Sequence, residues 1–211
     1  MVRLRAELLR FGTLPVSDPN APSLVSRVAG APISGSWWGH PAGPEIYRVA
    51  EALEADPDIL ALKLWRGKVT LVHRRLWPAL RKIGTEKSAW QLTGLNVIEL
   101  RLLAHLEGTA SVRRARTALV ERMDARSEMA AVRGLERRLL VLTRSVHTSG
   151  GAHALTVESW ADWGARTRTP AFRGSLASAE RTIEDSVRRL TPTADPRRQL
   201  PWGRPWIRTV R

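Results

Sequence analysis

Residues 92–158 contain three segments with the apolar spacing of helices, followed by two short apolar stretches. This order limits the folds open to the chain. Three segments repeat apolar residues every three or four positions, which predicts helices over Thr93–His105, over Ser111–Met123, and from Asp124 or Ser127 to about Arg138. Two apolar stretches then predict strands at Leu140–His147 and His153–Val157, joined by a turn at Thr148–Ala152. We therefore expect three helices followed by a β-hairpin.

The exit from the third predicted helix carries a family resemblance. The segment Gly134–Val141 reads Gly-Leu-Glu-Arg-Arg-Leu-Leu-Val and leads into a hairpin that turns at Gly150-Gly151. Together with the order of elements, it resembles the winged helix-turn-helix family of DNA-binding domains over roughly a third of the chain. The resemblance implies that the third helix enters the major groove, while the hairpin, or wing, contacts the DNA backbone or minor groove.

The third predicted helix has an arginine-rich face. If Val132, Leu135 and Leu139 face the core, the opposite side presents Arg126, Ala130, Arg133 and Arg137. Arginine can form two hydrogen bonds with guanine, and alanine can contact a thymine methyl group. We interpret this side as a DNA contact, and a solvated charged face is the alternative.

Polar residues in the second predicted helix and the wing extend this hypothesis. Arg113, Arg114 and Arg116 crowd the first turn of the helix, where a cation opposes the helix dipole unless a phosphate lies nearby. Arg144, His147 and Ser149 lie on or beside the turn of the wing. His147 and His153 face each other across the turn, but the sequence offers no third metal ligand, so we expect no metal site.

The net charge favours a polyanionic partner. Lys and Arg total 34 against 20 acidic residues, which gives a net charge of +14, and only four of the 34 are lysines. DNA is the expected partner and RNA the alternative. A GC-rich coding sequence also enriches arginine. Half of the surplus, +7, lies in residues 166–211, whereas residues 92–165 carry only +2.

The C-terminal residues have the composition of an extended basic arm. Residues 191–206 combine Pro, Gly and Arg with Trp202 and Trp206. Arginines that could lie along phosphates or enter a minor groove are Arg197, Arg198, Arg204, Arg208 and Arg211. The alternative is a terminus that packs on the protein surface.

Residues 1–91 predict a small α+β module. The patterns give helices at Leu4–Arg10, Glu45–Ala55 and Leu76–Ile83, the last ended by Gly84, and strands at Ile59–Trp65 and Lys68–His73. Residues 13–44 are rich in Pro, Ser and Gly and predict an irregular segment with a short helix near residues 23–29.

Within this irregular segment, Trp37-Trp38-Gly39-His40-Pro41 precedes Glu45. His40 and Glu45 are candidate acid/base residues, and they support an alternative function as a nucleic-acid-processing or DNA-repair enzyme. The other interpretation is that the tryptophans anchor the loop on the hairpin and that His40 is a capping group. Pro57-Asp58 lacks the second acid of a nuclease motif because Ala61 stands two positions before Lys63.

The chain lacks the residues or segments that several classes of function require. The chain has no cysteine, which excludes disulfides, thiolate catalysis and cysteine-bound metals. No glycine-rich phosphate loop occurs, so no cofactor is expected. No apolar run approaches the length of a membrane span and no signal peptide precedes the first predicted helix, so we expect a cytoplasmic location.

We therefore predict an α+β protein with three parts. Residues 1–91 form a helix–hairpin–helix module, residues 92–165 a winged-helix domain, and residues 166–211 an amphipathic helix with a basic arm. The expected function is duplex DNA binding, as a transcription regulator or DNA-associated accessory factor, and a homodimer is compatible with it.

Overall fold

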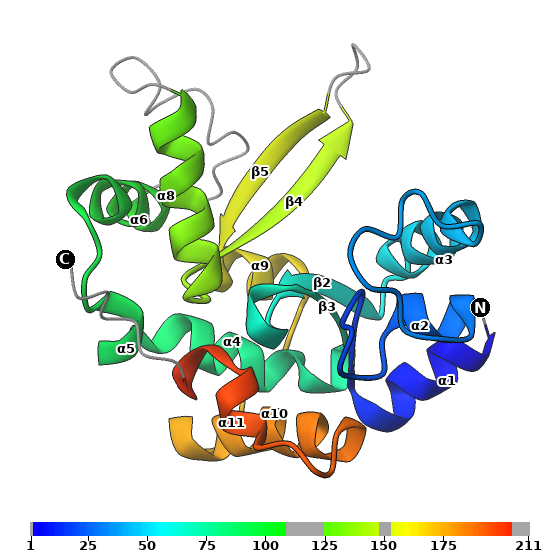
Figure 1. Cartoon of the computed structure of the whole chain (residues 1–211). Coiled ribbons are helices and arrows are strands. Elements are labelled where there is room, and N and C mark those ends of the chain that lie inside the picture. The colour runs from blue at the N-terminus through cyan, green and yellow to red at the C-terminus, as the bar shows by residue number, and fades with distance from the viewer. Residues whose placement is uncertain (1, 109–124, 148–152, 204–211) are drawn as a thin grey trace, which may run out of the picture. The chain divides into compact units, whose positions relative to one another are not determined.

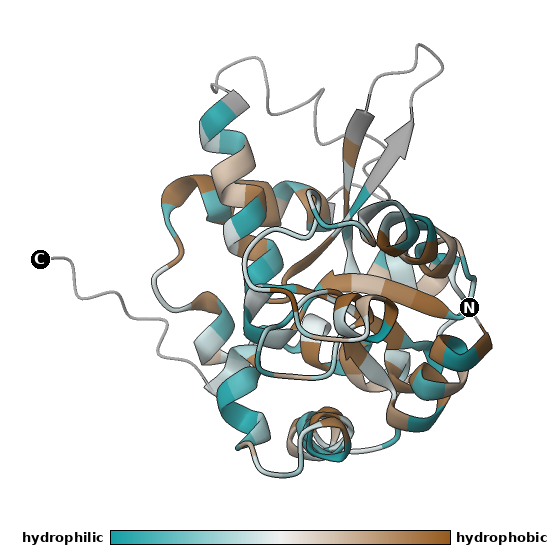
Figure 2. Ribbon diagram, turned by 45° about the vertical axis from the view of Figure 1, so that its right-hand side comes forward, coloured by the Kyte–Doolittle hydropathy of each residue, from teal (hydrophilic) through white to brown (hydrophobic). Residues whose placement is uncertain are grey.

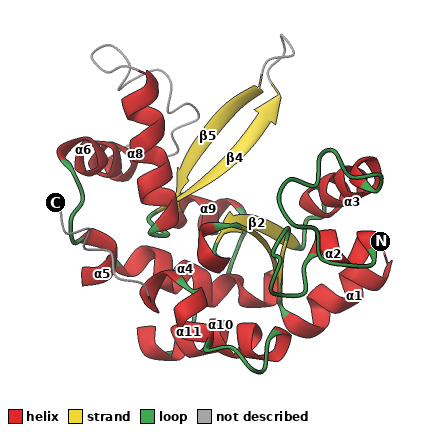
Figure 3. Ribbon diagram, in the orientation of Figure 1, coloured by secondary structure: helices red, strands yellow, loops and turns green. Residues whose placement is uncertain are grey.

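The computed structural model describes residues 2–108, 125–147 and 153–203. The protein is α+β, with helices around two small antiparallel sheets (Figure 1, Figure 3). Its contacts group it into two compact units: Met1–Leu80 with Gly174–Gly203, and Arg81–Arg173. This grouping differs from the linear division at residues 91 and 165, because residues 174–203 pack with the N-terminal residues.

The first unit contains a three-stranded sheet in the order β1–β3–β2. The predicted hairpin is confirmed as β2 (Ile59–Lys63) and β3 (Val69–His73), which pair antiparallel with Ile59 opposite His73. The unpredicted strand β1 (Thr13–Pro15) pairs with the other edge of β3. Its three residues are too few to show a period in sequence, so only their pairing with β3 defines them as a strand.

Five helices of the first unit pack around this sheet and around one another. They are α1 (Val2–Phe11), α2 (Leu24–Ala29), α3 (Gly43–Glu54), α10 (Leu176–Leu190) and α11 (Pro196–Gln199). Hydrophobic and hydrophilic residues alternate along the helices, as amphipathic packing requires (Figure 2). The predictions of helices near residues 4–10, 23–29 and 45–55, and of an amphipathic helix after residue 166, are confirmed.

A buried pair of hydroxyl groups joins the N-terminal and C-terminal segments that make up the first unit. Ser186 of α10 donates a hydrogen bond to the Phe11 carbonyl at 2.6 Å, and its Oγ lies 2.9 Å from Thr13 Oγ1. Gly12, between Phe11 and Thr13 in the sequence, has φ +92°. A Cβ at this position would lie 2.7 Å from the Leu76 side chain. This close approach explains why the C-terminal helix belongs to the same unit as α1 and β1.

The described part of the expected C-terminal arm is folded rather than extended. Asp195 caps α11 by accepting a hydrogen bond from the Arg197 N–H, and a 3-10 turn at Pro201–Gly203 follows. Leu200 and Trp202 are buried, and the Trp202 indole N–H donates to Glu184 of α10 at 2.8 Å. The described part of these C-terminal residues therefore packs on the protein surface, as the alternative held, and burying the Trp202 ring removes a large apolar surface from water.

The described part of the second unit contains the first and third of the helices expected after residue 91, and the expected hairpin. Its elements begin with the C-terminal part of α4 (Trp77–Glu86), and continue with α5 (Ala89–Leu92), α6 (Val97–Gly108), α8 (Ala125–Arg137), β4 (Val141–His147), β5 (His153–Ser159) and α9 (Trp160–Arg166). The two strands pair antiparallel, with Val141 opposite Ser159 at one end and His147 opposite His153 at the other. The predicted second helix, Ser111–Met123, lies outside the described residues.

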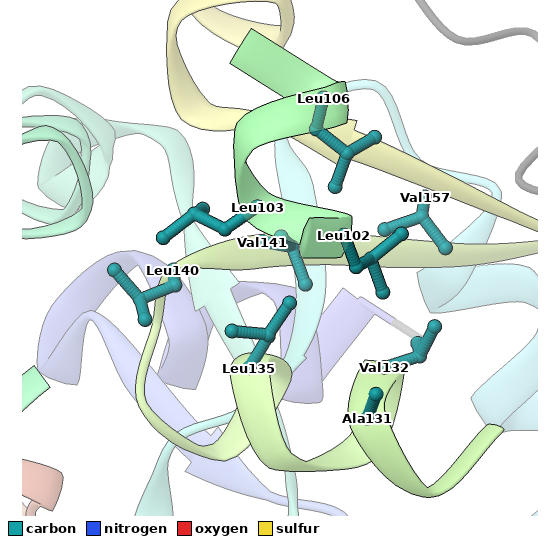
Figure 4. Close-up of a cluster of buried hydrophobic side chains, with 9 residues drawn as sticks. All are labelled: Leu102, Leu103, Leu106, Ala131, Val132, Leu135, Leu140, Val141 and Val157. Carbon is teal, nitrogen blue, oxygen red and sulfur yellow. The ribbon is translucent and has the colours of Figure 1, made fainter. Parts of the chain in front are cut away.

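One hydrophobic cluster joins α6, α8 and the hairpin (Figure 4). Its buried members are Leu102, Leu103, Leu106, Ala131, Val132, Leu135, Leu140, Val141 and Val157. Leu95, Ile98 and Leu155 are partly buried against it. The predicted inward side of the third helix is confirmed, since Val132, Leu135 and Leu139 are each at most 1% exposed.

Two predicted helix boundaries were wrong for local reasons. The helix expected from Thr93 begins at Val97, because the Asn96 side chain accepts hydrogen bonds from the Ile98 and Glu99 N–H groups and so caps α6. Gly84 does not end α4, which continues to Glu86. The glycine is needed for packing, because a Cβ there would overlap the ring of Trp160.

None of the helices in the described ranges combines the length and apolarity that crossing a bilayer requires.

We expect Gly84→Ala to destabilise the second unit. Alanine favours a helix by about 1 kcal/mol over glycine, but forcing a methyl group against the buried Trp160 ring costs ~1–3 kcal/mol. The thermal midpoint should fall, as measured by circular dichroism. Gly39→Ala is the matched control because nothing lies within 4 Å of a Cβ there. Equal midpoints for the two variants would contradict the packing role.

Candidate nucleic-acid interface

Helix α8 separates its apolar residues from its arginines. Ala131, Val132 and Leu135 are at most 2% exposed and belong to the core of the second unit. On the other side, the predicted residues Arg126, Ala130, Arg133 and Arg137 are exposed. The structure therefore brings these four residues together on one solvent-facing surface, here called the α8 basic face.

Two arginines of the α8 basic face have no carboxylate partner among the residues that the structure describes. Arg133 makes no side-chain hydrogen bond or ion pair with any residue that the structure describes. Arg137 Nε donates to the backbone carbonyl of Arg133 at 3.2 Å. The Arg137 guanidinium group has no carboxylate partner among the described residues. Both guanidinium groups can therefore bind an external anion.

The two carboxylates of α8 lie away from this face. Glu128 and Glu136 are each 7% exposed, and the Thr143 hydroxyl of β4 donates a hydrogen bond to Glu136. Thr143 thereby stabilises a buried carboxylate next to the corner between α8 and β4. The solvent-facing side of the helix is consequently more basic than the helix composition suggests.

A pair of buried polar side chains fixes the end of α8. Arg138 Nη1 donates to the carbonyls of Trp90, Gln91 and Thr93 at 3.2, 3.0 and 2.7 Å, and so satisfies the end of α5. In return, Gln91 Nε2 donates to the Arg138 carbonyl at 3.1 Å. We call this reciprocal arrangement the Gln91–Arg138 clasp. Burial lowers the pKa of Arg138. The nearby carboxylate of Glu99 raises this pKa, and the positive charge of Arg137 lowers it further.

Sequence reasoning did not find the clasp, although one signal of it was present. Ser88 and Gln91 have the spacing of a capping box, and Gln91 Oε1 accepts a hydrogen bond from the Ser88 N–H at 2.8 Å. That bond orients the amide so that its nitrogen points toward the end of α8. The carbonyl acceptors of Arg138, however, lie more than forty residues away in sequence and leave no local pattern.

A glycine permits α6 and α8 to approach closely. A Cβ on Gly134 would overlap the carboxylate of Glu99, which is 8% exposed and accepts a hydrogen bond from the Asn96 N–H at 2.9 Å. Glu99 thus completes the cap of α6 while lying against the backbone of α8. Leu139 then adopts φ +53°, a left-handed conformation that turns the chain from α8 into β4.

The other predicted contact residues are only partly described. Arg144 is exposed on β4, and Arg197 and Arg198 are exposed on α11 of the first unit, where Arg198 pairs with Asp195 at 3.4 Å. His147 ends β4, but its side chain lies outside the described residues. The remaining predicted contacts lie outside the described residues: Arg113, Arg114, Arg116, Ser149, Arg204, Arg208 and Arg211.

The candidate acid/base residues have local structural roles. His40 Nδ1 accepts a hydrogen bond from the Ala42 N–H at 3.1 Å, and Glu45 pairs with Arg48 at 2.6 Å. His40 is thus a capping group, as the alternative interpretation held, but the expectation that both tryptophans anchor the loop was wrong for Trp38, which is 67% exposed. No group of three His, Asp or Glu side chains in the described ranges is placed to hold a metal ion.

Comparison with known proteins gave no relatives. The chain matches no protein-family model, and neither curated proteins nor solved structures gave a match.

We expect Arg138→Met to destabilise the second unit by about 2–3 kcal/mol, because it removes charge-assisted hydrogen bonds from buried carbonyls. The neighbouring Arg137→Met is the matched control, since Arg137 is exposed and should change stability by less than ~0.5 kcal/mol. Urea denaturation of both variants measures the difference. Similar losses in the two variants would show that the clasp does not stabilise the fold.

Proposed function

We propose that this chain is a DNA-binding protein of winged-helix type that acts as a transcription regulator or DNA-associated accessory factor. The observation that carries the proposal is the α8 basic face, which presents three arginines around Ala130 on a helix fixed by its opposite side. The order α6, α8, β4, β5 supports the winged-helix assignment, because the helix that reads DNA in that family directly precedes the hairpin.

The dimensions of the α8 basic face fit duplex DNA. Arg126 and Arg137 are eleven residues apart on one helix, which corresponds to roughly 16 Å along the axis and to about five base pairs. The major groove of B-DNA is about 12 Å wide and admits a helix. The deep, narrow major groove of duplex RNA does not, which favours DNA as the partner.

In this proposal, each residue type has a separate task. Arg133 and Arg137, which lack carboxylate partners in the described ranges, contact guanine edges or phosphates, and the small Ala130 allows the helix backbone to approach the bases. Arg144 of β4 contacts the DNA backbone beside the groove. The Gln91–Arg138 clasp and the Glu99–Gly134 contact hold α8 in place and so reduce the ordering cost of binding.

We expect the double substitution Arg133→Ala and Arg137→Ala to lower the affinity for duplex DNA by at least about tenfold, because each arginine contact contributes ~1–3 kcal/mol. Fluorescence anisotropy with a labelled duplex, repeated across salt concentrations, measures the effect. Each lost phosphate contact should also reduce the salt dependence by about 0.9 in the log–log slope.

The control for this experiment is Arg188→Ala with Arg189→Ala, which removes two exposed arginines from α10. It has the same net charge as the α8 double variant, so a loss of affinity that both variants share reflects charge alone. Unchanged duplex affinity in the α8 variant, or equal binding of duplex DNA, single-stranded DNA and RNA by the unmodified protein, would refute the proposal.

A further inference from the structure

Three aromatic side chains of the first unit form an exposed cluster. Trp37 and Trp38 stack with ring centroids 4.2 Å apart, and Trp38 contacts Tyr47 of α3 at 5.8 Å. Trp38 is 67% exposed and Tyr47 is 48% exposed. Exposed large aromatic groups of this kind are enriched where proteins bind partners.

The loop that presents Trp38 is held by its own backbone. The His40 N–H donates to the Trp37 carbonyl at 3.1 Å, and the Gly43 N–H donates to the His40 carbonyl at 2.7 Å. A Cβ on Gly43 would lie 3.1 Å from the carbonyl oxygens of both tryptophans, so the glycine permits this tight arrangement. Because the rings are held before any partner arrives, binding to them costs little ordering entropy.

The charge next to this cluster is negative, in contrast to the chain as a whole. Tyr47, Glu51 and Glu54 have the spacing of one helix face, and all three are exposed. Arg48 pairs with Glu45, whereas the side chains of Glu51 and Glu54 form no ion pair or hydrogen bond within the described ranges. Neighbouring groups partly desolvate the Glu54 carboxylate, and this effect together with the repulsion of Glu51 raises the pKa of Glu54. A cation beside the two carboxylates would relieve that repulsion.

We propose that Trp37, Trp38, Tyr47, Glu51 and Glu54, here called the aromatic–acidic face, bind an arginine-containing segment of a protein partner. Guanidinium groups stack on indole rings and form paired hydrogen bonds with carboxylates, so one residue type satisfies both parts of the face. A nucleic-acid strand could stack on Trp38, but its phosphates would be repelled by the two unpaired carboxylates. Because Glu51 and Glu54 have no cationic partner among the described residues, the chemistry favours an arginine-containing peptide, and this inference does not depend on the proposed DNA binding.

The geometry also indicates the spacing of the partner's arginines. Tyr47 and Glu54 are seven residues apart on α3, which is about 10 Å along the helix axis. An extended peptide covers that distance in about three residues. Arginines at every third position of an extended segment can therefore reach Trp38 and the two carboxylates together.

The test uses a fluorescein-labelled peptide of four Arg-Gly-Gly repeats and the full chain, measured by anisotropy. The measurement uses physiological salt, at which the Debye length is about 8 Å. The arginines of the protein that lie far from the aromatic–acidic face then repel the basic peptide only weakly. We expect the unmodified protein to bind this peptide more tightly than its lysine counterpart. Trp38→Ala should weaken binding at least fivefold, and so should Glu51→Gln combined with Glu54→Gln, while Trp38→Phe should retain part of the affinity.

Asp185→Asn with Asp195→Asn is the charge-matched control, because it removes two exposed carboxylates elsewhere in the first unit and should leave peptide binding unchanged. Circular dichroism establishes that each variant is folded. Three outcomes would overturn the inference: no binding by the unmodified protein, equal binding by Trp38→Ala, or a Trp38→Ala defect confined to single-stranded oligonucleotide. None of these depends on the variants of α8, so the two proposals fail separately.

Discussion

The Gln91–Arg138 clasp is the interaction on which the candidate interface depends. Arg138 directly follows α8, and its guanidinium group binds the carbonyls at the end of α5 while Gln91 binds the carbonyl of Arg138. Burying a charge is costly unless it is paired or hydrogen-bonded, and these carbonyls supply that compensation. The next residue, Leu139, is buried and turns the chain into β4. The clasp therefore holds the chain at the corner between the end of α8 and the start of the hairpin.

The arginine surplus of the sequence is not equally available on the structure. In the first unit, Arg66 and Lys68 lie near the buried carboxylate of Asp18, and Arg74 pairs with Asp58. In the second unit, Arg133 and Arg137 have no carboxylate partner among the described residues. The net charge of +14 therefore does not show where basic surface lies, whereas the exposure of Arg126, Arg133 and Arg137 does.

Prediction from sequence succeeded where a feature depends on local periodicity. The third helix and its inward residues follow from apolar repeats of three to four residues, and both hairpins follow from pairs of apolar stretches joined by short turns. It failed where a distant partner decides the outcome. Gly84 lies inside a helix and packs against Trp160, and Trp202 is buried with its indole N–H bonded to Glu184 of α10.

The sequence by itself determined the class of the fold and the residues of the α8 basic face, because the spacing of arginines on a helix is a local property. Only the tertiary structure decided that Gln91 and Arg138 meet, that β1 adds a third strand, and that Trp38 and Tyr47 form an exposed surface beside Glu51. These features join residues from separate segments of the chain. Their energies come from burial and from hydrogen bonds between groups that no local pattern brings together.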